Sequence, residues 1–311
     1  MKRIFIDGSA GTTGLRIYDR LGQRDGIELI TLPEEERKNP DSRKQALNEA
    51  DVAFLCLPDA AAVEAVGMIE NPNTVVIDAS TAHRTNSGWA YGFPELSAKH
   101  EEKIINSKRI AVPGCHASGF IALVYPLIEA EILDSSALLS CFSLTGYSGG
   151  GKKMIAEYES ETKDILLSAP RQYALGQTHK HLKEMKAVTG LSSAPVFCPT
   201  VGNFYSGMEV TVPLFGCQLK NKADINTVRS VYSDKYTGSI VSYQECFDNS
   251  GFLSAASLSG KDNMIISVYG NDERMILTAV YDNLGKGASG AAIECLNTVT
   301  GMDKTFGLSL T

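Results

Sequence analysis

One cysteine of the chain stands where a nucleophile could be activated. Cys115 follows the strand-like stretch "RIAVPG" and precedes "HASGFIALVYPLI". The apolar residues of that second stretch have the spacing of one buried helix face: Phe120, Leu123, Val124, Leu127 and Ile128. We therefore expect Cys115 near a helix start, where unpaired N–H groups and the positive end of the helix dipole favour a thiolate. The alternative is a buried, unreactive cysteine that packs as a small hydrophobic residue.

A thiolate nucleophile needs a base, and the stretch "THKHLKEM" offers His179 and His181, followed by Glu184. If the whole stretch is helical, the two imidazoles point to nearly opposite sides, so at most one faces a given pocket. Glu184 then lies one turn from His181 and could orient its ring. We prefer His181 as the base and keep His179 as the alternative.

A glycine-rich turn follows the first predicted strand. In "DGSAGTTG" the glycines are spaced three residues apart, and a helix is expected from Thr12 to about Gly22. Glycines let the backbone approach a pyrophosphate closely, and the helix start aims free N–H groups at its charge. The turn therefore predicts a dinucleotide site. Its candidate cofactor-binding residues are Gly8, Ser9, Gly11, Thr12, Thr13 and Gly14.

The loop after the second predicted strand, "TLPEEERKNP", bears on which dinucleotide is bound. Glu34 could accept a hydrogen bond from a ribose 2′-hydroxyl, which favours NAD. Arg37 and Lys38 could instead bind a 2′-phosphate, which favours NADP. The loop alone leaves both cofactors open, and a solvated charged loop is a third interpretation.

A polar segment follows the predicted strand "VVID". Ser80 is a candidate cofactor contact, and Arg84 has the forked guanidinium that suits a phosphate or a carboxylate. Arg84 could equally pair with Asp78 or Glu95 and have a structural role.

Two glycine-rich segments later in the chain could hold anions at helix starts. "TGYSGGGKKM" supplies the candidate substrate residues Ser148, Gly149 and Lys152. "DNLGKGASGAA" supplies Asn283 and Gly287 as candidate cofactor contacts before a last apolar helix.

The composition limits the class of protein. The chain has 311 residues, 43% of them hydrophobic, which is enough for two domains. A net charge of -7 provides no basic field for nucleic acid or an anionic membrane, so a small molecule is the expected partner. The seven cysteines are scattered and odd in number, which argues against disulfides and against a zinc site, and predicts a reducing cytoplasm. The sequence shows neither a signal peptide nor a run of about 18 apolar residues.

The order of the predicted elements indicates an α/β fold with a second, α+β part. Strand-like and helix-like segments alternate through the first half, which is typical of a parallel sheet covered by helices. After Ile132 longer strands appear, with helices expected near 152–167 and 223–236, which favours an antiparallel or mixed sheet.

Together these motifs resemble the N-acetyl-γ-glutamyl-phosphate reductases of arginine biosynthesis, in their shorter form. The segments that carry the resemblance are the glycine turn, "DASTAHR", "YGFPEL", "PGCHASG", "SGGGK", the His179-x-His181-x-x-Glu184 cluster and "NLGKGASGAA". Lys183 departs from the longer form, which usually has a proline there, and this bears on how Glu184 is oriented.

The resemblance implies a Rossmann domain formed by residues 1–114 and 284–311, and a catalytic and dimerisation domain formed by residues 115–283. It also implies NADP(H) as cofactor, a thioester on Cys115, Glu184 among the substrate-binding residues, and a homodimer or homotetramer. Three other functions remain alternatives: a reductase similar to aspartate-semialdehyde dehydrogenase, a cysteine hydrolase without cofactor, and a non-catalytic nucleotide sensor. The paired histidines and the "NLGKGASGAA" segment favour the glutamyl enzyme over the first.

Overall fold

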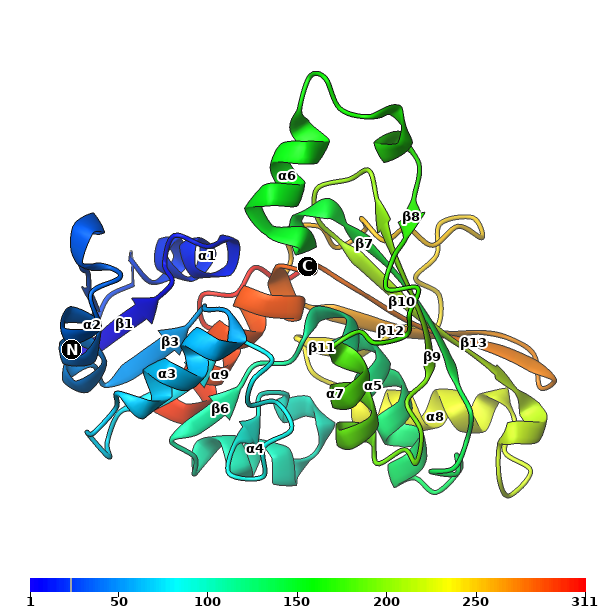
Figure 1. Cartoon of the computed structure of the whole chain (residues 1–311). Helices are drawn as coiled ribbons and strands as arrows, with labels where there is room; N and C mark the ends of the chain where they lie inside the picture. The colour runs from blue at the N-terminus through cyan, green and yellow to red at the C-terminus, as the bar shows by residue number, and fades with distance from the viewer. Residues whose placement is uncertain (23) are drawn as a thin grey trace. The chain divides into compact units, whose positions relative to one another are not determined.

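The computed structural model describes residues 1–22 and 24–311, and they form two compact units. The first comprises Met1–Pro113 and Ala288–Leu308, and the second Gly114–Gly287 and Ser309–Thr311. Each unit contains one β-sheet (Figure 1). No helix within the described residues is long and apolar enough to cross a bilayer.

The first unit is a parallel six-stranded sheet in the order β2-β1-β3-β4-β6-β5. Its strands are β1 (Lys2–Asp7), β2 (Ile27–Ile30), β3 (Val52–Leu55), β4 (Val75–Asp78), β5 (Ala90–Tyr91) and β6 (Arg109–Ala111). Its helices are α1 (Thr12–Leu21), α2 (Pro40–Glu49), α3 (Asp59–Gly67), α4 (Ala98–Ile105) and α9 (Gly290–Thr300), with short 3₁₀ turns at Glu34–Glu36 and Pro94–Leu96. The expected parallel α/β architecture is confirmed.

The central strands of this sheet are fully buried, as is typical of parallel sheets. All four residues of β3 and of β4 are buried, as a sheet covered on both faces requires. The apolar helix α9 packs against α4 and β4, although more than 170 residues separate it from the rest of the unit. The C-terminal segment therefore completes the core of the N-terminal unit.

The second unit is a mixed seven-stranded sheet in the order β11-β12-β13-β10-β7-β9-β8. Its strands are β7 (Ser140–Gly146), β8 (Arg171–Gln172), β9 (Val196–Gly202), β10 (Met208–Phe215), β11 (Val241–Tyr243), β12 (Met264–Gly270) and β13 (Arg274–Tyr281). Its α-helices are α5 (Cys115–Glu129), α6 (Gly151–Glu159), α7 (His181–Thr189) and α8 (Ile225–Lys235). Short helical turns lie at Tyr147–Gly150, Ile165–Ser168 and Gly216–Gln218, and a π-helical turn at Gly285–Ser289 precedes α9.

The two faces of this sheet differ. Helix α5 packs on β10 and β13, with α7 and α8 beside it, and together these helices cover one face (Figure 1). The other face carries exposed apolar side chains. Phe142 of β7 is paired with Thr211 of β10 and Cys198 of β9, and Pro213 of β10 with Ile276 of β13, so these residues share that face.

The three glycines of the nucleotide turn have different roles. Gly8 has a φ of +88°, and a Cβ there would lie 2.4 Å from the carbonyl oxygen of Cys56. A Cβ on Gly14 would lie 2.4 Å from the carbonyl oxygen of Gly8. Gly11, the N-cap of α1, has a φ of -74°, and a Cβ there would lie 3.4 Å from its nearest neighbour, the carbonyl oxygen of Gly8. Gly8 and Gly14 are therefore required by the packing of the turn itself, whereas Gly11 is not.

This difference predicts how glycine substitutions affect stability. Gly14→Ala should lower the free energy of unfolding of the N-terminal unit by about 1–3 kcal/mol, because the backbone must move to admit the methyl group. Gly11→Ala, the matched control, should cost less than about 1 kcal/mol. Urea denaturation of the two variants measures both values, and equal losses would contradict the packing role of Gly14.

Candidate active site

Cys115 is the first residue of α5, and its side chain is partly exposed. The preceding residue, Gly114, is the N-cap and has no side chain with which to cap the helix. Its N–H donates to Oε1 of Glu184 at 2.8 Å, and Glu184 lies on α7 with only 2% of its surface exposed. A carboxylate at a helix N-terminus interacts favourably with the helix dipole. Glu184 thus fixes the backbone that leads into the cysteine, a contact that the sequence did not predict.

Tyr281, the last residue of β13, holds the first turn of α5 from the other side. Its hydroxyl donates to the carbonyl oxygen of Cys115 and accepts from the N–H of Gly119 at 3.0 Å. A Cβ on residue 119 would lie 2.8 Å from this hydroxyl, so the approach requires glycine. Burial and the nearby Cys115 raise the pKa of Tyr281 well above its usual value, which keeps its proton in place.

The loop after β13 connects two groups of predicted site residues. A Cβ on Gly287 would lie 3.0 Å from the Cβ of Cys115. The side-chain amide of Asn283 donates to Oγ of Ser148 at 3.0 Å, and its oxygen accepts from the N–H of Gly207. The structure therefore places Gly287 beside Cys115 and joins Asn283 to Ser148. Both Asn283 and Ser148 are nearly completely buried.

The two histidines lie closer together than a continuous helix would allow. Helix α7 begins only at His181, so His179 belongs to the preceding turn, and the two ring centroids are 4.7 Å apart. Opposite orientations were expected only if the whole stretch is helical, and this condition is not met, because His179 lies outside α7. The N–H of His181 donates to Nδ1 of His179 at 3.3 Å. A neutral His179 ring then carries its proton on Nε2.

The protonation of His179 follows from its surroundings. Burial lowers its pKa, and the neighbouring Lys180 charge lowers it further. At neutral pH His179 is therefore a neutral imidazole whose Nε2–H is a hydrogen-bond donor.

Three further polar side chains at this site were missed by the sequence analysis. His116, directly after the cysteine, places Nδ1 2.6 Å from Oγ of Ser143 and Nε2 2.7 Å from the hydroxyl of Tyr173. Its ring lies 5.8 Å from that of His179 and 5.5 Å from that of His181. A histidine next to a candidate nucleophile, in a chain with five histidines, was the available signal. Its partners Ser143 and Tyr173 lie far from it in the chain, and no sequence pattern pointed to them.

Ser80 and Arg84 lie in the N-terminal unit, just after β4. The Ser80 hydroxyl donates to the buried Asp78 carboxylate at 2.7 Å, and Nδ1 of His83 lies 2.6 Å from the same carboxylate. Arg84 donates Nε to the carbonyl of Val112 at 2.8 Å, and a second nitrogen to a carbonyl of its own loop. Asp78 is thus bonded to Ser80 and His83, and Arg84 connects its loop to the strand end that precedes the cysteine in the chain.

Four further candidates, Arg37, Lys38, Gly149 and Lys152, are exposed. Arg37 and Lys38 follow the 3₁₀ turn Glu34–Glu36, and Nε of Arg37 donates to the carbonyl of Leu32 at 3.3 Å. Lys152 lies exposed in the first turn of α6, which has no side-chain cap. Gly149 is also exposed, and a Cβ there would lie 3.4 Å from the Asn283 amide.

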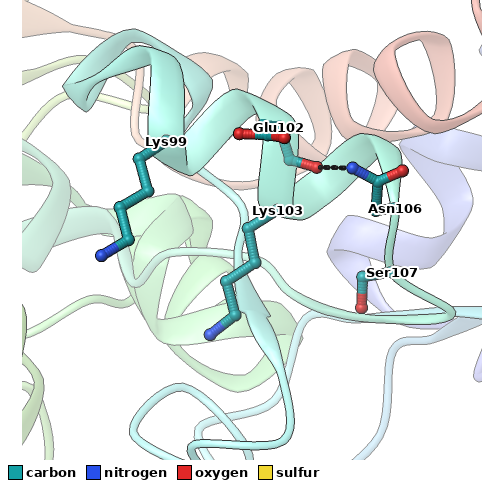
Figure 2. Close-up of a pocket in the computed structure, with 5 residues that line it drawn as sticks. All are labelled: Lys99, Glu102, Lys103, Asn106 and Ser107. Carbon is teal, nitrogen blue, oxygen red and sulfur yellow. Dashed lines mark hydrogen bonds between the residues drawn. The ribbon is translucent and has the colours of Figure 1, made fainter.

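A shallow surface depression lies on α4 of the first unit, lined by Lys99, Glu102, Lys103, Asn106 and Ser107 (Figure 2). The two lysine side chains extend in the same direction, and Asn106 bonds back to the carbonyl of Glu102. The depression contains none of the cysteine, histidine or glycine-turn residues predicted for the site, and we do not treat it as the candidate active site. Within residues 1–22 and 24–311, no group of three or more histidine, cysteine or acidic side chains could hold a metal ion.

The chain matches known families over most of its length. Residues 3–104 match the NAD binding domain of semialdehyde dehydrogenases, and residues 115–283 match their dimerisation domain. Among solved structures, aspartate semialdehyde dehydrogenase II of Vibrio cholerae, complexed with ASA, superimposes with a TM-score of 0.73 at 16% identity, covering 97% of this chain and 98% of that one. That similarity concerns the fold.

Curated relatives are similar in sequence as well. N-acetyl-gamma-glutamyl-phosphate reductase of Trichormus variabilis is 43% identical over 318 residues, covering 98% of this chain and 99% of that protein. The protein of the same name from Brucella anthropi is 44% identical over 306 residues, covering 96% and 98%. With the cysteine at a helix start, the histidine pair and the glycine turn, the chain belongs to the N-acetyl-γ-glutamyl-phosphate reductases of the semialdehyde dehydrogenase family.

Proposed function

We propose that this chain reduces N-acetyl-γ-glutamyl phosphate to N-acetylglutamate semialdehyde and phosphate, with Cys115 as the nucleophile and NADPH as the reductant. The observation that carries the proposal is the position of Cys115. It is the first residue of a buried helix, and its two flanking backbone groups are held by Glu184 and Tyr281. An inert structural cysteine needs no such support.

The N-terminal unit fits a dinucleotide. The turn after β1 brings Gly11 to the start of α1, which has no side-chain cap, and no side chain projects from Gly8, Gly11 or Gly14. We assign the pyrophosphate to this turn, with Ser9, Thr12 and Thr13 around it, and the 2′-phosphate to Arg37 and Lys38. Ser80, Asn283 and Gly287 complete the proposed cofactor contacts. When bound, the cofactor supplies the hydride.

The chemical steps use groups of the second unit. The Cys115 sulfur attacks the acyl carbon, its proton passes to His181, and the C–O bond to phosphate breaks to leave a thioester. N–H groups of the first turn of α5, which have no partner carbonyl within the helix, stabilise the oxyanion. After hydride addition the C–S bond breaks, the aldehyde leaves, and the thiolate is regenerated.

The hydrogen bond between the histidines supports His181 as the base. Nδ1 of His179 accepts the N–H of His181, which leaves the proton on Nε2 of a neutral His179. In that tautomer His179 is a donor and suits an oxygen of the acyl phosphate. Arg84, Lys152, Glu184 and the Ser148–Gly149 turn are the other proposed substrate contacts.

The reactivity of the seven thiols tests the nucleophile. Cys217 and Cys246 are exposed and should be replaced by serine, so that they do not compete for the reagent. Burial raises the pKa of Cys56 to about 12, so this thiol stays protonated at neutral pH. Iodoacetamide at pH 7 should then label Cys115 first, and the acyl phosphate should protect it; peptide mass mapping identifies the site. Cys115→Ser should abolish reduction yet keep NADPH binding.

Two results would contradict this assignment. One is near-normal turnover by Cys115→Ser. The other is first labelling at a different cysteine without protection by the substrate. Either would return Cys115 to a structural role.

The preference for NADPH is tested by removing the two basic residues after the 3₁₀ turn. Arg37→Ala with Lys38→Ala should weaken NADPH binding about tenfold or more and leave NADH binding nearly unchanged, because only NADPH carries the 2′-phosphate. Lys99→Ala with Lys103→Ala on α4 removes the same charge elsewhere and is the matched control (Figure 2). Fluorescence titrations measure all the dissociation constants. Equal losses for both cofactors would reject the assignment.

The exposed apolar residues on the open face of the second sheet support association into a homodimer. A homotetramer could be built from two such dimers. Its exposed apolar residues include Phe142, Phe215 and Ile276, exposed by 51%, 63% and 45%. Several large apolar side chains exposed on one sheet face are typical of an interface. A second copy is the proposed occupant, because this sheet belongs to the segment that matches a dimerisation domain. Seven free thiols support a reducing cytosol as its location.

Charge placed on this face should dissociate the oligomer. Phe142→Glu with Ile276→Glu should reduce the mass measured by light scattering to the 33.5 kDa of one chain. Phe252→Glu, at an exposed loop position outside the sheet, should leave the mass unchanged. A monomeric wild type, or equal dissociation by the control, would rule out this interface.

A further inference from the structure

His116 is a buried titratable residue that the proposed reaction does not use. Only 3% of its surface is exposed, although its neighbour in the chain is the nucleophile. Its ring sits between the Ser143 hydroxyl, on the covered face of β7, and the Tyr173 hydroxyl, just after β8. The three groups form a continuous chain of hydrogen bonds that crosses the site.

The charge state of the ring limits how this chain can be oriented. Burial, and repulsion by His179, lower the pKa of His116 to about 3. The ring is therefore neutral at any pH near neutrality, with one nitrogen donating and the other accepting. Burial and the nearby Cys115 raise the pKa of Tyr173, so the phenol also keeps its proton.

The hydrogen bonds from Ser143 through His116 to Tyr173 can run in either of two directions, and the burial of the two end groups favours one of them. Ser143 is 1% exposed, whereas Tyr173 is only partly buried. If the chain ran from Tyr173 to Ser143, the last proton would point into the packed core, where an unsatisfied donor is costly. If Ser143 donates to Nδ1, Nε2–H donates to the Tyr173 oxygen, and the phenolic proton is left to donate elsewhere. Cys115 is close enough to Tyr173 for its charge to raise the pKa of the phenol.

The segment that carries Tyr173 is itself fixed. The N–H of Tyr173 donates to the carbonyl of Pro199, and the side-chain amide of Gln177 pairs with both backbone groups of Phe197, at 2.7 and 2.8 Å. These contacts hold the segment from Tyr173 to His179 against β9. The hydroxyl therefore has a defined position next to the imidazoles of His116 and His179.

We propose that His116 is a positioning residue that, backed by Ser143, holds the Tyr173 hydroxyl as a hydrogen-bond donor to the Cys115 sulfur in the free enzyme and to the acyl oxygen in the thioester. The inference rests on the proposed function for its second half only. Its first half concerns the free thiol and can be tested without substrate.

Two substitutions at position 116 separate the two ends of the ring. The amide of Gln reaches the place of Nε2 and can still donate to Tyr173, whereas the amide of Asn reaches only the place of Nδ1 and Ser143. Tyr173→Phe removes the donor and leaves the ring in place. The other titratable residues packed around Cys115 and His116 are His179, His181, Glu184 and Tyr281, and they are unchanged in all the variants.

The first readout is the pH dependence of Cys115 alkylation. Loss of a hydrogen bond to the thiolate should move the midpoint upward by about half a unit to one unit in Tyr173→Phe and His116→Asn, and less in His116→Gln. The second readout is turnover. The first two variants should lose about 100-fold in kcat with little change in KM, since removal of one oxyanion donor has an effect of that size.

A double-mutant cycle distinguishes positioning from general damage. If His116 acts through Tyr173, then His116→Asn with Tyr173→Phe should be no slower than Tyr173→Phe alone. Additive losses, or an unchanged alkylation midpoint in the folded Tyr173→Phe variant, would overturn the inference. If the alkylation midpoint shifts but the wild-type protein does not reduce the acyl phosphate, the contact between Tyr173 and the thiolate is supported. The proposed function is then the part that is rejected.

Discussion

The first turn of α5 is the feature on which the site depends. A helix start leaves N–H groups without partners, and here that start is surrounded by protein. The Glu184 carboxylate takes the N–H of Gly114, and the Tyr281 hydroxyl bridges Cys115 and Gly119. A hydrogen bond to a charged group contributes about 1.5–3 kcal/mol, and an unpaired buried donor costs about as much. Glu184 and Tyr281 therefore fix the backbone on both sides of Cys115.

These contacts need close packing around the cysteine. Gly119 admits the Tyr281 hydroxyl, and Gly287 admits the Cys115 side chain, because neither position has room for a Cβ. The Asn283 amide then connects the same loop to Ser148. One short loop after β13 therefore contacts both Cys115, the proposed nucleophile, and a proposed substrate turn.

Successive side chains of the strands in the second unit point to opposite faces of the sheet, so one face lines the site and the other is exposed. Ser143 and Phe197 point to the covered face and contact the His116 ring, whereas the neighbouring Phe142 and Val196 point to the open face. The segment before α7 includes Ala174 and Gln177 with φ values of 52° and 54°. Such left-handed backbone costs about 1–2 kcal/mol per non-glycine residue. The Gln177 amide, paired with β9, offsets part of that cost.

The sequence alone was enough to predict the features of this protein that depend on local residue patterns. Apolar spacing and glycine turns predicted the parallel α/β sheet, the helix that begins at Thr12 and the helix that carries Cys115, because these depend on residues close together in the chain. The sequence did not predict the relative orientation of His179 and His181, because that orientation depends on where α7 begins. Only the tertiary structure decided that Glu184 contacts Gly114, that Tyr281 contacts Cys115, and that Ser143 and Tyr173 enclose His116. These partners are separated by 70, 166, 27 and 57 residues, and no local periodicity reports which side chains a folded sheet and helix bring into contact.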